Sequence, residues 1–260
     1  MNCKICESDS LPVFKATVLN KYFVQYYQCS HCGFIQTEKA YWLKEAYTDA
    51  ISSLDTGIMK RNIYFSQLIT AIIGLLKKTK GTFLDYGGGL GIFTRLMRDR
   101  GLNFFWYDLN AHNYLAHGFE GSFENSKYDM VTAFECFEHF ENPLDEIEKI
   151  LSVTDTLFFT TELAASKAES PDRWWYYCLE HGQHISLYTE ETLRYLASKY
   201  NLNLTTNKVN LHILSRKPLS GRILWWARIL TKLKLDFWFN LKSKTMEDMH
   251  YMILKLKKDN

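Results

Sequence analysis

The stretch that decides the fold is Thr82-Phe83-Leu84-Asp85-Tyr86-Gly87-Gly88-Gly89-Leu90-Gly91-Ile92-Phe93-Thr94-Arg95. The apolar residues before Asp85 predict a strand, and apolar residues recur after the glycines at helical spacing, at Ile92, Phe93, Leu96 and Met97. Glycines between them allow a sharp turn and let a ligand approach the backbone, because no Cβ occupies that space. The helix after the turn would direct its unpaired N–H groups and its positive dipole end at the ligand. A carboxylate or a phosphate suits such a position.

An acidic residue follows the next apolar run at the distance that a second strand requires. Asp108 ends the run Phe104–Tyr107 and lies 21 residues beyond Gly87, which leaves room for a turn, a helix and a strand. The dinucleotide-binding pattern G-x-G-x-x-G would need a glycine at Ile92, so the sequence argues against a bound NAD. The alternative to a ligand site is a glycine-rich turn in an α/β domain that binds nothing.

The pattern Asp85-x-Gly87-x-Gly89-x-Gly91 resembles motif I of the class I S-adenosylmethionine-dependent methyltransferases. The resemblance implies a Rossmann-like α/β fold with a mostly parallel seven-stranded sheet whose last strand is antiparallel. It implies that the glycine loop wraps the methionine end of S-adenosylmethionine and that Asp85 helps to orient the amino group of this cofactor. It also implies that Asp108 binds the ribose hydroxyls and that Leu109 contacts the cofactor.

The composition indicates a globular protein with room for one α/β domain and a small additional domain. The chain has 260 residues, 47% of them hydrophobic, which is enough for a core. The formal net charge is only +2, so no nucleic-acid partner is expected. We expect a cytoplasmic protein, because Met1–Lys4 lacks an apolar signal core and no apolar run approaches the ~18 residues that a membrane span needs.

Two Cys-x-x-Cys pairs, Cys3/Cys6 and Cys29/Cys32, predict a zinc site in residues 1–40. Four thiolates satisfy tetrahedral zinc, and so few residues need the metal to hold them folded. We therefore expect a structural zinc ribbon, with a hairpin between Phe14 and Gln28. Few basic residues accompany it, which disfavours a nucleic-acid-binding ribbon. Beside a methyltransferase core, this ribbon resembles the N-terminal zinc domain of bacterial deoxysugar C-methyltransferases.

A buried strand is expected from Tyr128 to Phe134, and an acidic segment follows it. The segment Phe134–Phe140 resembles the region after the fourth strand of this superfamily, which implies that Phe134 and Glu135 contact the cofactor. Glu135, Glu138 and His139 also resemble a magnesium-binding pattern of quinone-biosynthesis O-methyltransferases. His is a less natural ligand of magnesium than a carboxylate. Because the same pattern recurs in relatives not known to need a metal, we favour a structural and substrate-edge role for these residues over a metal site.

The segment from Asp172 to Thr189 combines an aromatic cluster with Glu180-His181-Gly182-Gln183-His184. Such a loop concentrates binding surface and proton-transfer groups. The run that starts at His184 resembles the His-(Leu/Ile)-Ser-x-(Phe/Tyr)-Ser segment of the sugar C-methyltransferases, whose histidine takes a proton from the substrate. His184 is therefore our hypothetical catalytic base, and His181 is the alternative. Either histidine has the competing interpretation that it only forms hydrogen bonds within the loop.

The remaining segments complete an α/β pattern. Asn142 and Pro143 predict the cap and first turn of a helix that ends at Leu151. Residues 157–161 predict a strand, Thr189 starts a helix that runs to about Tyr200, and residues 203–215 predict a final hairpin.

The C-terminal residues 219–260 predict a helix with one apolar face, formed by Ile223, Trp226, Leu230, Leu233 and Phe237. Packing on the catalytic domain is the preferred interpretation. Contact with a membrane surface or a second copy of the chain is the alternative, since basic residues are scattered around this face. The predicted domains are thus the zinc ribbon (1–40), the methyltransferase domain (41–218) and a helical extension (219–260).

The sequence therefore predicts an S-adenosylmethionine-dependent methyltransferase that acts on a hydroxyl or carbon of a small molecule, with a nucleotide-linked or surface-glycan sugar as one candidate. A quinone-pathway-like O-methyltransferase is the first alternative. The second is a non-catalytic zinc-ribbon interaction protein on the same fold.

Overall fold

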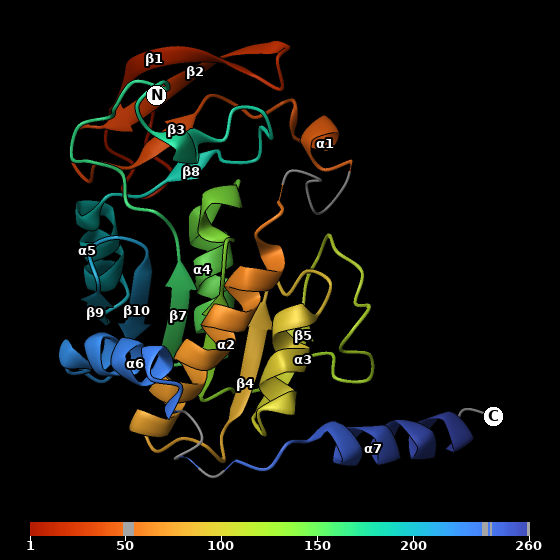
Figure 1. Cartoon of the computed structure of the whole chain (residues 1–260). Helices are drawn as coiled ribbons and strands as arrows, with labels where there is room; N and C mark the ends of the chain where they lie inside the picture. The colour runs from red at the N-terminus through yellow and green to blue at the C-terminus, as the bar shows by residue number, and fades with distance from the viewer. Residues whose placement is uncertain (49–54, 236–238, 240, 259–260) are drawn as a thin grey trace. The chain divides into compact units, whose positions relative to one another are not determined.

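A computed structural model describes residues 1–48, 55–235, 239 and 241–258 of the chain (Figure 1). The chain forms two compact units, each built from two separate segments. The first unit comprises Met1–Ser52 and Ala133–Leu219, and the second comprises Ser53–Thr132 and Ser220–Asn260. The three consecutive domains expected from the sequence stay a prediction. Within the described residues, no helix has the length and apolar character that spanning a bilayer requires.

The second unit carries the glycine-rich stretch on a parallel sheet. Strand β4 (Thr82–Tyr86) lies between β5 (Asn103–Tyr107) and β6 (Met130–Ala133), and both neighbours are parallel to it. Helix α3 (Ile92–Asp99) follows β4 directly, so the predicted order of strand, glycine turn and helix is confirmed. The other helices of this unit are α2 (Ile58–Leu75), α6 (Arg222–Lys232) and α7 (Thr245–Lys258).

Aromatic side chains fill the core of the second unit. Phe83 of β4 stacks on Phe104 of β5 with 5.0 Å between ring centroids, and Phe93 of α3 meets Phe104 edge-on at 5.5 Å. All three rings are buried. This packing fixes the start of α3 against the end of β4, and the glycine turn lies between them.

The sequence predicts seven strands in the α/β sheet, but the described residues form six, three in each unit. Between β5 and β6 the chain forms only a single parallel bridge, from Trp106 to Glu120. The intervening residues form turns that are held by side-chain hydrogen bonds, such as that from Asn113 Nδ2 to Glu120 Oε1 at 2.9 Å. Local polar contacts thus replace a strand ladder here.

In the first unit, the cysteine-containing residues form an antiparallel sheet. Strands β1 (Ser10–Val18) and β2 (Tyr22–Cys29) make the hairpin expected between Phe14 and Gln28. Three residues, Leu19 to Lys21, connect the paired residues Val18 and Tyr22, and both Leu19 and Asn20 have a φ of 53°, in the left-handed region. Strand β3 (Ile35–Thr37) pairs with β2 and with β8 (Ser186–Leu187). The sheet that begins at the N-terminus therefore includes Ser186 and Leu187, which follow shortly after His184 in the chain.

The rest of the first unit contains helices and the three antiparallel strands that belong to the six-stranded sheet. Strand β10 (Leu211–Ser215) pairs antiparallel with both β7 (Thr156–Thr160) and β9 (Asn203–Thr206), which confirms the final hairpin and its antiparallel last strand. The helices are α1 (Leu43–Ala46), α4 (Pro143–Leu151), α5 (Glu190–Lys199) and the short 3₁₀ turns η1 (Phe137–His139) and η2 (Trp175–Tyr177).

An aromatic core joins the β1–β2 hairpin to the segment before His184. It contains the buried side chains of Tyr26, Trp42, Tyr176, Tyr177 and Ile185. Tyr26 and Tyr177 meet edge-on at 5.6 Å between ring centroids. The ribbon sheet and the aromatic loop thus share one core within the first unit.

Candidate functional site

The glycine turn of the second unit adopts the conformation that its glycines permit. Gly87, Gly89 and Gly91 have φ values of 70°, 53° and 83°, where a side chain would be strained. Gly88 needs its small size for a different reason: a Cβ there would lie 2.5 Å from Cδ1 of Trp106 and 2.9 Å from Oδ2 of Asp85. The bare backbone of this turn is thus required by its own geometry.

Asp85 lies at the end of β4 and is buried beneath the turn. Thr94 of α3 donates its hydroxyl to Oδ2 at 2.9 Å, and Thr132 of β6 donates to Oδ1 at 3.3 Å. Burial raises the pKa of the Asp85 carboxyl to about 7, against the opposing effect of these two hydrogen bonds. Asp85 therefore ties α3 and β6 to the turn from below.

Asp108 faces the same turn from the end of β5. Its Oδ2 accepts a hydrogen bond from the Gly89 N–H at 2.9 Å, and its Oδ1 accepts from the N–H groups of Asn110 and Ala111. Trp106 completes the contact by donating Nε1–H to the Gly89 carbonyl at 2.9 Å. Leu109, the next residue, is 65% exposed. The acid at the end of the second strand thus lies against the glycine turn.

The turn has the features of a site for an anionic or polar ligand. Helix α3 starts at Ile92 with Gly91 as its N-cap, and no side chain caps it. The positive end of the helix dipole therefore lies at the turn without a side-chain counter-charge from its own cap. A small molecule with a carboxylate and with hydroxyl groups matches this arrangement of a helix start and an acid.

In the first unit, Phe134 and Glu135 follow β6. Glu135 has a φ of 52°, unusual for a residue with a side chain. Thr160 of β7 stabilises it, because its Oγ1 accepts from the Glu135 N–H at 2.9 Å and donates to Glu135 Oε1 at 2.8 Å. Phe134 meets Phe158 edge-on. Both predicted residues are therefore held by β7.

Glu138, which is buried, forms a cluster with His139 and His184, which are partly buried, in the same unit. One ligand atom from each lies within 4.8 Å of the others. Both carboxyl oxygens of Glu138 and Nδ1 of His139 are buried without a hydrogen-bond partner, a costly arrangement for polar groups. The cluster therefore has unused capacity to bind a ligand or a proton.

The electrostatics of this cluster favour neutral groups. Burial raises the pKa of Glu138 to about 8, and the nearby Glu135 adds to the shift. Burial lowers the pKa of His139 to about 4 and that of His184 to about 3. At neutral pH the imidazoles are thus unprotonated, and a large share of Glu138 keeps its proton.

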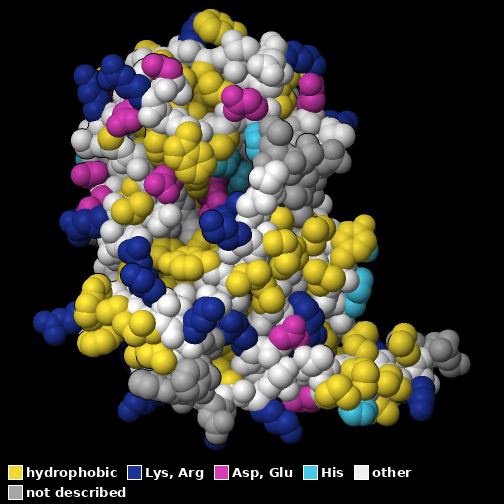
Figure 2. Space-filling model, viewed as in Figure 1, with side chains coloured by type: hydrophobic (Ala, Val, Ile, Leu, Met, Phe, Trp, Pro, Cys, Tyr) yellow, Lys and Arg dark blue, Asp and Glu magenta, His cyan; other side chains and the backbone are white. Residues whose placement is uncertain are grey.

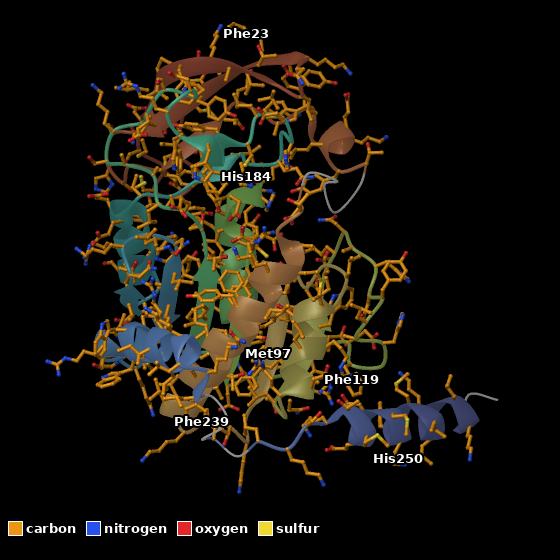
Figure 3. All side chains as sticks on the ribbon, in the orientation of Figure 1. Phe23, Met97, Phe119, His184, Phe239 and His250 are labelled. Carbon is orange, nitrogen blue, oxygen red and sulfur yellow. The ribbon has the colours of Figure 1, made fainter. Side chains whose placement is uncertain are left out.

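His184 lies close to β8, as Figure 3 shows. Its Nδ1 lies 2.6 Å from the Tyr176 carbonyl. A carbonyl only accepts, so Nδ1 carries the proton and Nε2 keeps its lone pair. The loop is held from α1 and its N-cap: Trp42 Nε1 donates to the Gly182 carbonyl at 2.7 Å, and Gln183 Nε2 donates to the Ala46 carbonyl at 2.6 Å.

His181, the alternative base, is partly exposed. Among the described residues, His184 and not His181 lies within ligand distance of Glu138 and His139. His181 stays the alternative base predicted from the sequence.

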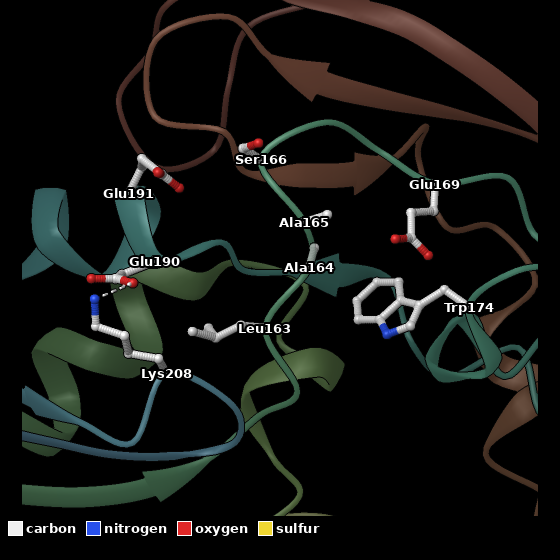
Figure 4. Close-up of a pocket in the computed structure, with 9 residues that line it drawn as sticks. All are labelled: Leu163, Ala164, Ala165, Ser166, Glu169, Trp174, Glu190, Glu191 and Lys208. Atoms are coloured by element: carbon white, nitrogen blue, oxygen red, sulfur yellow. Dashed lines mark ion pairs between the residues drawn. The ribbon is translucent and has the colours of Figure 1, made fainter.

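A pocket of about 390 Å³ lies in the first unit, beside the chain that follows β7 (Figure 4). Trp174 and Glu169 line one side, and Glu190, Glu191 and Lys208 line the other. Lys208 Nζ lies 3.6 Å from a Glu190 carboxyl oxygen. The ring of Trp174 lies 5.5 Å from that of Tyr176, whose ring in turn lies 4.6 Å from His184. One wall of the pocket is thus two ring contacts away from the candidate base.

The four predicted zinc ligands come together in the first unit. The Sγ atoms of Cys3 and Cys32 are 3.6 Å apart, and those of Cys6 and Cys29 are 3.4 Å apart. Zinc–sulfur bonds of ~2.3 Å in a tetrahedron place the sulfurs about 3.8 Å apart, so the cysteines fit a zinc ion. The N–H groups of Ile5 and Cys32 point at Sγ of Cys3 and Cys29, which suits thiolates. None of these four cysteines forms a disulfide bond.

Sequence reasoning missed the residues that hold the site from a distance. Thr94, Thr132 and Thr160 bind the carboxyl groups of Asp85 and Glu135, and Trp42 holds the loop before His184. A threonine or tryptophan with such a role has no sequence signature of its own. The three threonines lay within stretches that the sequence had marked as a strand or a turn and helix, but none had been assigned a role.

Residues 60–207, more than half of the chain, match the protein family described as "Methyltransferase domain". The chain therefore belongs to this family, with its Rossmann-like fold and mixed sheet. The family match thus identifies the chain as a methyltransferase. This favours an enzyme over the non-catalytic interaction protein.

Comparison with solved structures gives distant likenesses. An O-methyltransferase family protein from Burkholderia thailandensis is 14% identical, with 69% of this chain and 68% of that chain covered and a TM-score of 0.44. The magnesium protoporphyrin IX methyltransferase of Synechocystis PCC 6803 with bound SAH is 13% identical (68% and 95% covered, TM-score 0.42). An O-methyltransferase family 2 protein of Planctomyces limnophilus in complex with apigenin is 16% identical (67% and 65% covered, TM-score 0.47).

None of the curated proteins matches the chain. The family assignment therefore rests on the match of residues 60–207.

Proposed function

We propose that the glycine turn of the second unit binds S-adenosylmethionine and that the acid–histidine loop of the first unit acts on a small-molecule acceptor. The observation that carries the cofactor site is the turn itself, with Gly87, Gly89 and Gly91 at positive φ and Asp108 against it. When bound, the cofactor supplies an electrophilic methyl group. The uncapped start of α3 suits its carboxylate, and Asp108 suits its ribose hydroxyls.

Further cofactor contacts are proposed for residues around this turn. Asp85 acts on the cofactor through the turn that it supports, since its own oxygens bind Thr94 and Thr132. Leu109 is exposed and free to cover an apolar part of the cofactor. Phe134 and Glu135 are also proposed to contact the cofactor, because they directly follow β6.

His184 is proposed to take the proton of the acceptor. Methyl transfer is a single displacement, so the protein must align the acceptor and, for a hydroxyl, remove its proton. The bond from Nδ1–H to the Tyr176 carbonyl leaves Nε2 to receive that proton. The imidazolium that forms would be a buried cation, and the Glu138 carboxylate would be its counter-charge. Turnover should therefore rise as Glu138 loses its proton near pH 8.

A sugar, nucleotide-linked or part of a surface glycan, is the proposed acceptor. The pocket beside β7 offers an indole ring at Trp174 and a carboxylate at Glu169. An aromatic face and carboxylates that accept from hydroxyl groups suit a polyhydroxylated ring. Transfer of labelled methyl from S-adenosylmethionine to a panel of nucleotide sugars tests this. Transfer to phenolic quinone precursors and to no sugar would reject it.

A metal-assisted O-methyltransferase of the quinone-pathway type is the second candidate, and one observation favours it. Glu138 and His139 have unpartnered buried atoms, and they lie with His184 within ligand distance. Two imidazoles and one carboxylate suit a divalent transition metal better than magnesium. Metal analysis of the Cys3→Ser/Cys6→Ser variant would show bound metal in this case, and a chelator would stop turnover. Full activity in a chelator rejects this candidate.

Zinc at Cys3, Cys6, Cys29 and Cys32 is proposed to be structural. Three of these side chains are buried, and their sheet shares a core with the aromatic loop. Metal binding would therefore stabilise both the N-terminal sheet and the loop that carries His184. One zinc per chain, lost in Cys29→Ser, is the expected result of elemental analysis.

A further inference from the structure

Helix α6 of the second unit exposes a pair of tryptophans. Its other face is buried through Ile223, Leu224, Ala227 and Thr231. Trp225 and Trp226 are 57% and 50% exposed, and their rings meet edge-on at 4.6 Å between centroids. One face of the helix is thus packed against the protein, and the other face exposes a large apolar surface. Exposed apolar surfaces of this kind in monomeric proteins often have a binding function.

Basic residues surround this pair. Residues 220–235 contain four basic residues and no acidic one. All four side chains are exposed: Arg222, Arg228, Lys232 and Lys234. Figure 2 shows hydrophobic side chains over α6 beside Lys and Arg side chains. We call this surface, formed by the two tryptophans and the four basic residues, the α6 face.

The charge of the α6 face argues against a second copy of the chain as its partner. A symmetric dimer brings the same surface of both subunits together. Two α6 faces would then place eight basic side chains in one interface, four from each copy. Like charges at an interface are unfavourable. The partner should instead be anionic.

The tryptophans narrow the chemistry of that partner. Indole rings favour the boundary between lipid tails and headgroups, because one end is apolar and the other binds water. Lys and Arg around them are attracted to anionic lipid headgroups, each by about fivefold in partition. Amphipathic helices with these two features lie in the plane of a membrane surface.

We propose that the α6 face binds the surface of an anionic lipid bilayer, with Trp225 and Trp226 inserted at headgroup level. The methyltransferase would then be held at a membrane. Phe237, which the sequence also assigned to this helical face, lies outside the described residues, and the proposal does not depend on it.

Co-sedimentation of the full chain with lipid vesicles tests the proposal. Vesicles that contain phosphatidylglycerol should bind the protein about tenfold or more better than pure phosphatidylcholine vesicles, and high salt should weaken this binding. Trp225→Ser/Trp226→Ser should lose about tenfold or more in binding. Trp175→Ser is the matched control, because Trp175 lies in the first unit and is 71% exposed; it should bind like the unchanged protein.

A charge-reversal pair separates lipid charge from general stickiness. Arg228→Glu/Lys232→Glu should abolish the preference for phosphatidylglycerol, whereas Lys167→Glu, an exposed position in the first unit, should keep it. All variants should have the melting temperature of the unchanged protein, because substitutions at exposed positions usually have little effect on stability.

Three outcomes would overturn the proposal. They are no vesicle binding by the unchanged protein, equal binding to charged and neutral vesicles, and full binding by Trp225→Ser/Trp226→Ser. A dimer in sedimentation equilibrium that the tryptophan variant converts to a monomer would also overturn it, because a second copy would then cover the α6 face.

Discussion

Asp85 of the second unit and Glu138 of the first are both fully buried carboxylic acids, but their surroundings differ. Asp85 receives hydrogen bonds from two threonine hydroxyls. Glu138 has no hydrogen-bond partner on either oxygen. A buried carboxyl group that accepts hydrogen bonds stabilises the backbone arrangement of its partners. A buried carboxyl group without hydrogen-bond partners lowers the stability of the fold, unless a bound ligand or a proton compensates for the missing hydrogen bonds. The difference distinguishes the acid that supports the proposed cofactor turn from the acid beside the proposed catalytic base.

The largest expected effect comes from the loop that faces Glu138. His184→Ala removes the proposed base, so turnover should fall by roughly 10²–10⁴-fold. Binding of S-adenosylhomocysteine should stay unchanged, since this ligand is expected at the glycine turn of the second unit. Single-turnover kinetics and calorimetry measure the two quantities. His181→Ala is the matched control, and a loss of turnover in this variant alone would exchange the roles of the histidines.

The two acids should differ in the pH window over which they affect stability. Both have a pKa in the folded protein above the ordinary values of 3.8 and 4.5, at about 7 for Asp85 and about 8 for Glu138. Their contributions to stability are complete below those ordinary values and are lost as pH rises through 7 and 8 respectively. Glu138→Gln should therefore gain roughly 3–5 kcal/mol relative to the unchanged protein between pH 4 and 9.

Asp85→Asn is the comparison for that measurement. It should remove the loss of stability between about pH 3.8 and 7 that belongs to Asp85, and it should leave in place the loss between about pH 4.5 and 8 that belongs to Glu138. Denaturant unfolding at a series of pH values gives both curves. Identical curves for the two variants would show that the acids are not distinct in this way.

A smaller effect is expected when Asp85 loses one partner. Thr94→Val removes a hydrogen bond to a buried acid and should cost about 1–2 kcal/mol of unfolding free energy. It should also weaken binding of S-adenosylhomocysteine, because Thr94 supports the turn. Thr70→Val is the control, since this buried hydroxyl donates to the Ser66 carbonyl within α2. Equal affinity of both variants would separate Asp85 from the cofactor turn.

The smallest expected effect on stability is that of Leu109→Ala. Its side chain is mostly exposed, so the unfolding free energy should change by less than about 0.5 kcal/mol. The affinity for S-adenosylhomocysteine should nevertheless fall by several-fold if Leu109 covers the cofactor. An unchanged affinity would remove Leu109 from the proposed site.

The sequence was most informative where a function needs a local backbone shape. The local sequence predicted the sharp turn, in which Gly87, Gly89 and Gly91 have positive φ, and it predicted that helix α3 follows strand β4. The same holds for the start of α5, where Thr189 and Thr192 cap each other. At α4 the helix was predicted correctly, but Asn142 makes no side-chain hydrogen bond to it. Local patterns thus predicted the elements better than their contacts.

Contacts between residues far apart in the chain could not be predicted from the sequence. His184 meets Glu138 from 46 residues away along the chain, and Trp42 binds the loop across 140 residues. No periodicity encodes such a meeting, because it depends on how the strands of the first unit pair. The absence of a strand near Glu120 has a similar explanation. Glu120 forms one parallel bridge with Trp106, and its side chain accepts hydrogen bonds from neighbouring turn residues, and these contacts could not be predicted from the sequence pattern.

Calorimetric titration of S-adenosylhomocysteine into the unchanged protein and into Asp108→Ala tests the central claim most directly. The account predicts saturable binding to the unchanged protein at one site, and about tenfold or greater loss of affinity in the variant, since charged hydrogen bonds to a ligand are worth roughly 1.5–3 kcal/mol. Equal affinity of the two proteins, or no binding to either, would contradict the assignment of the glycine turn as the cofactor site.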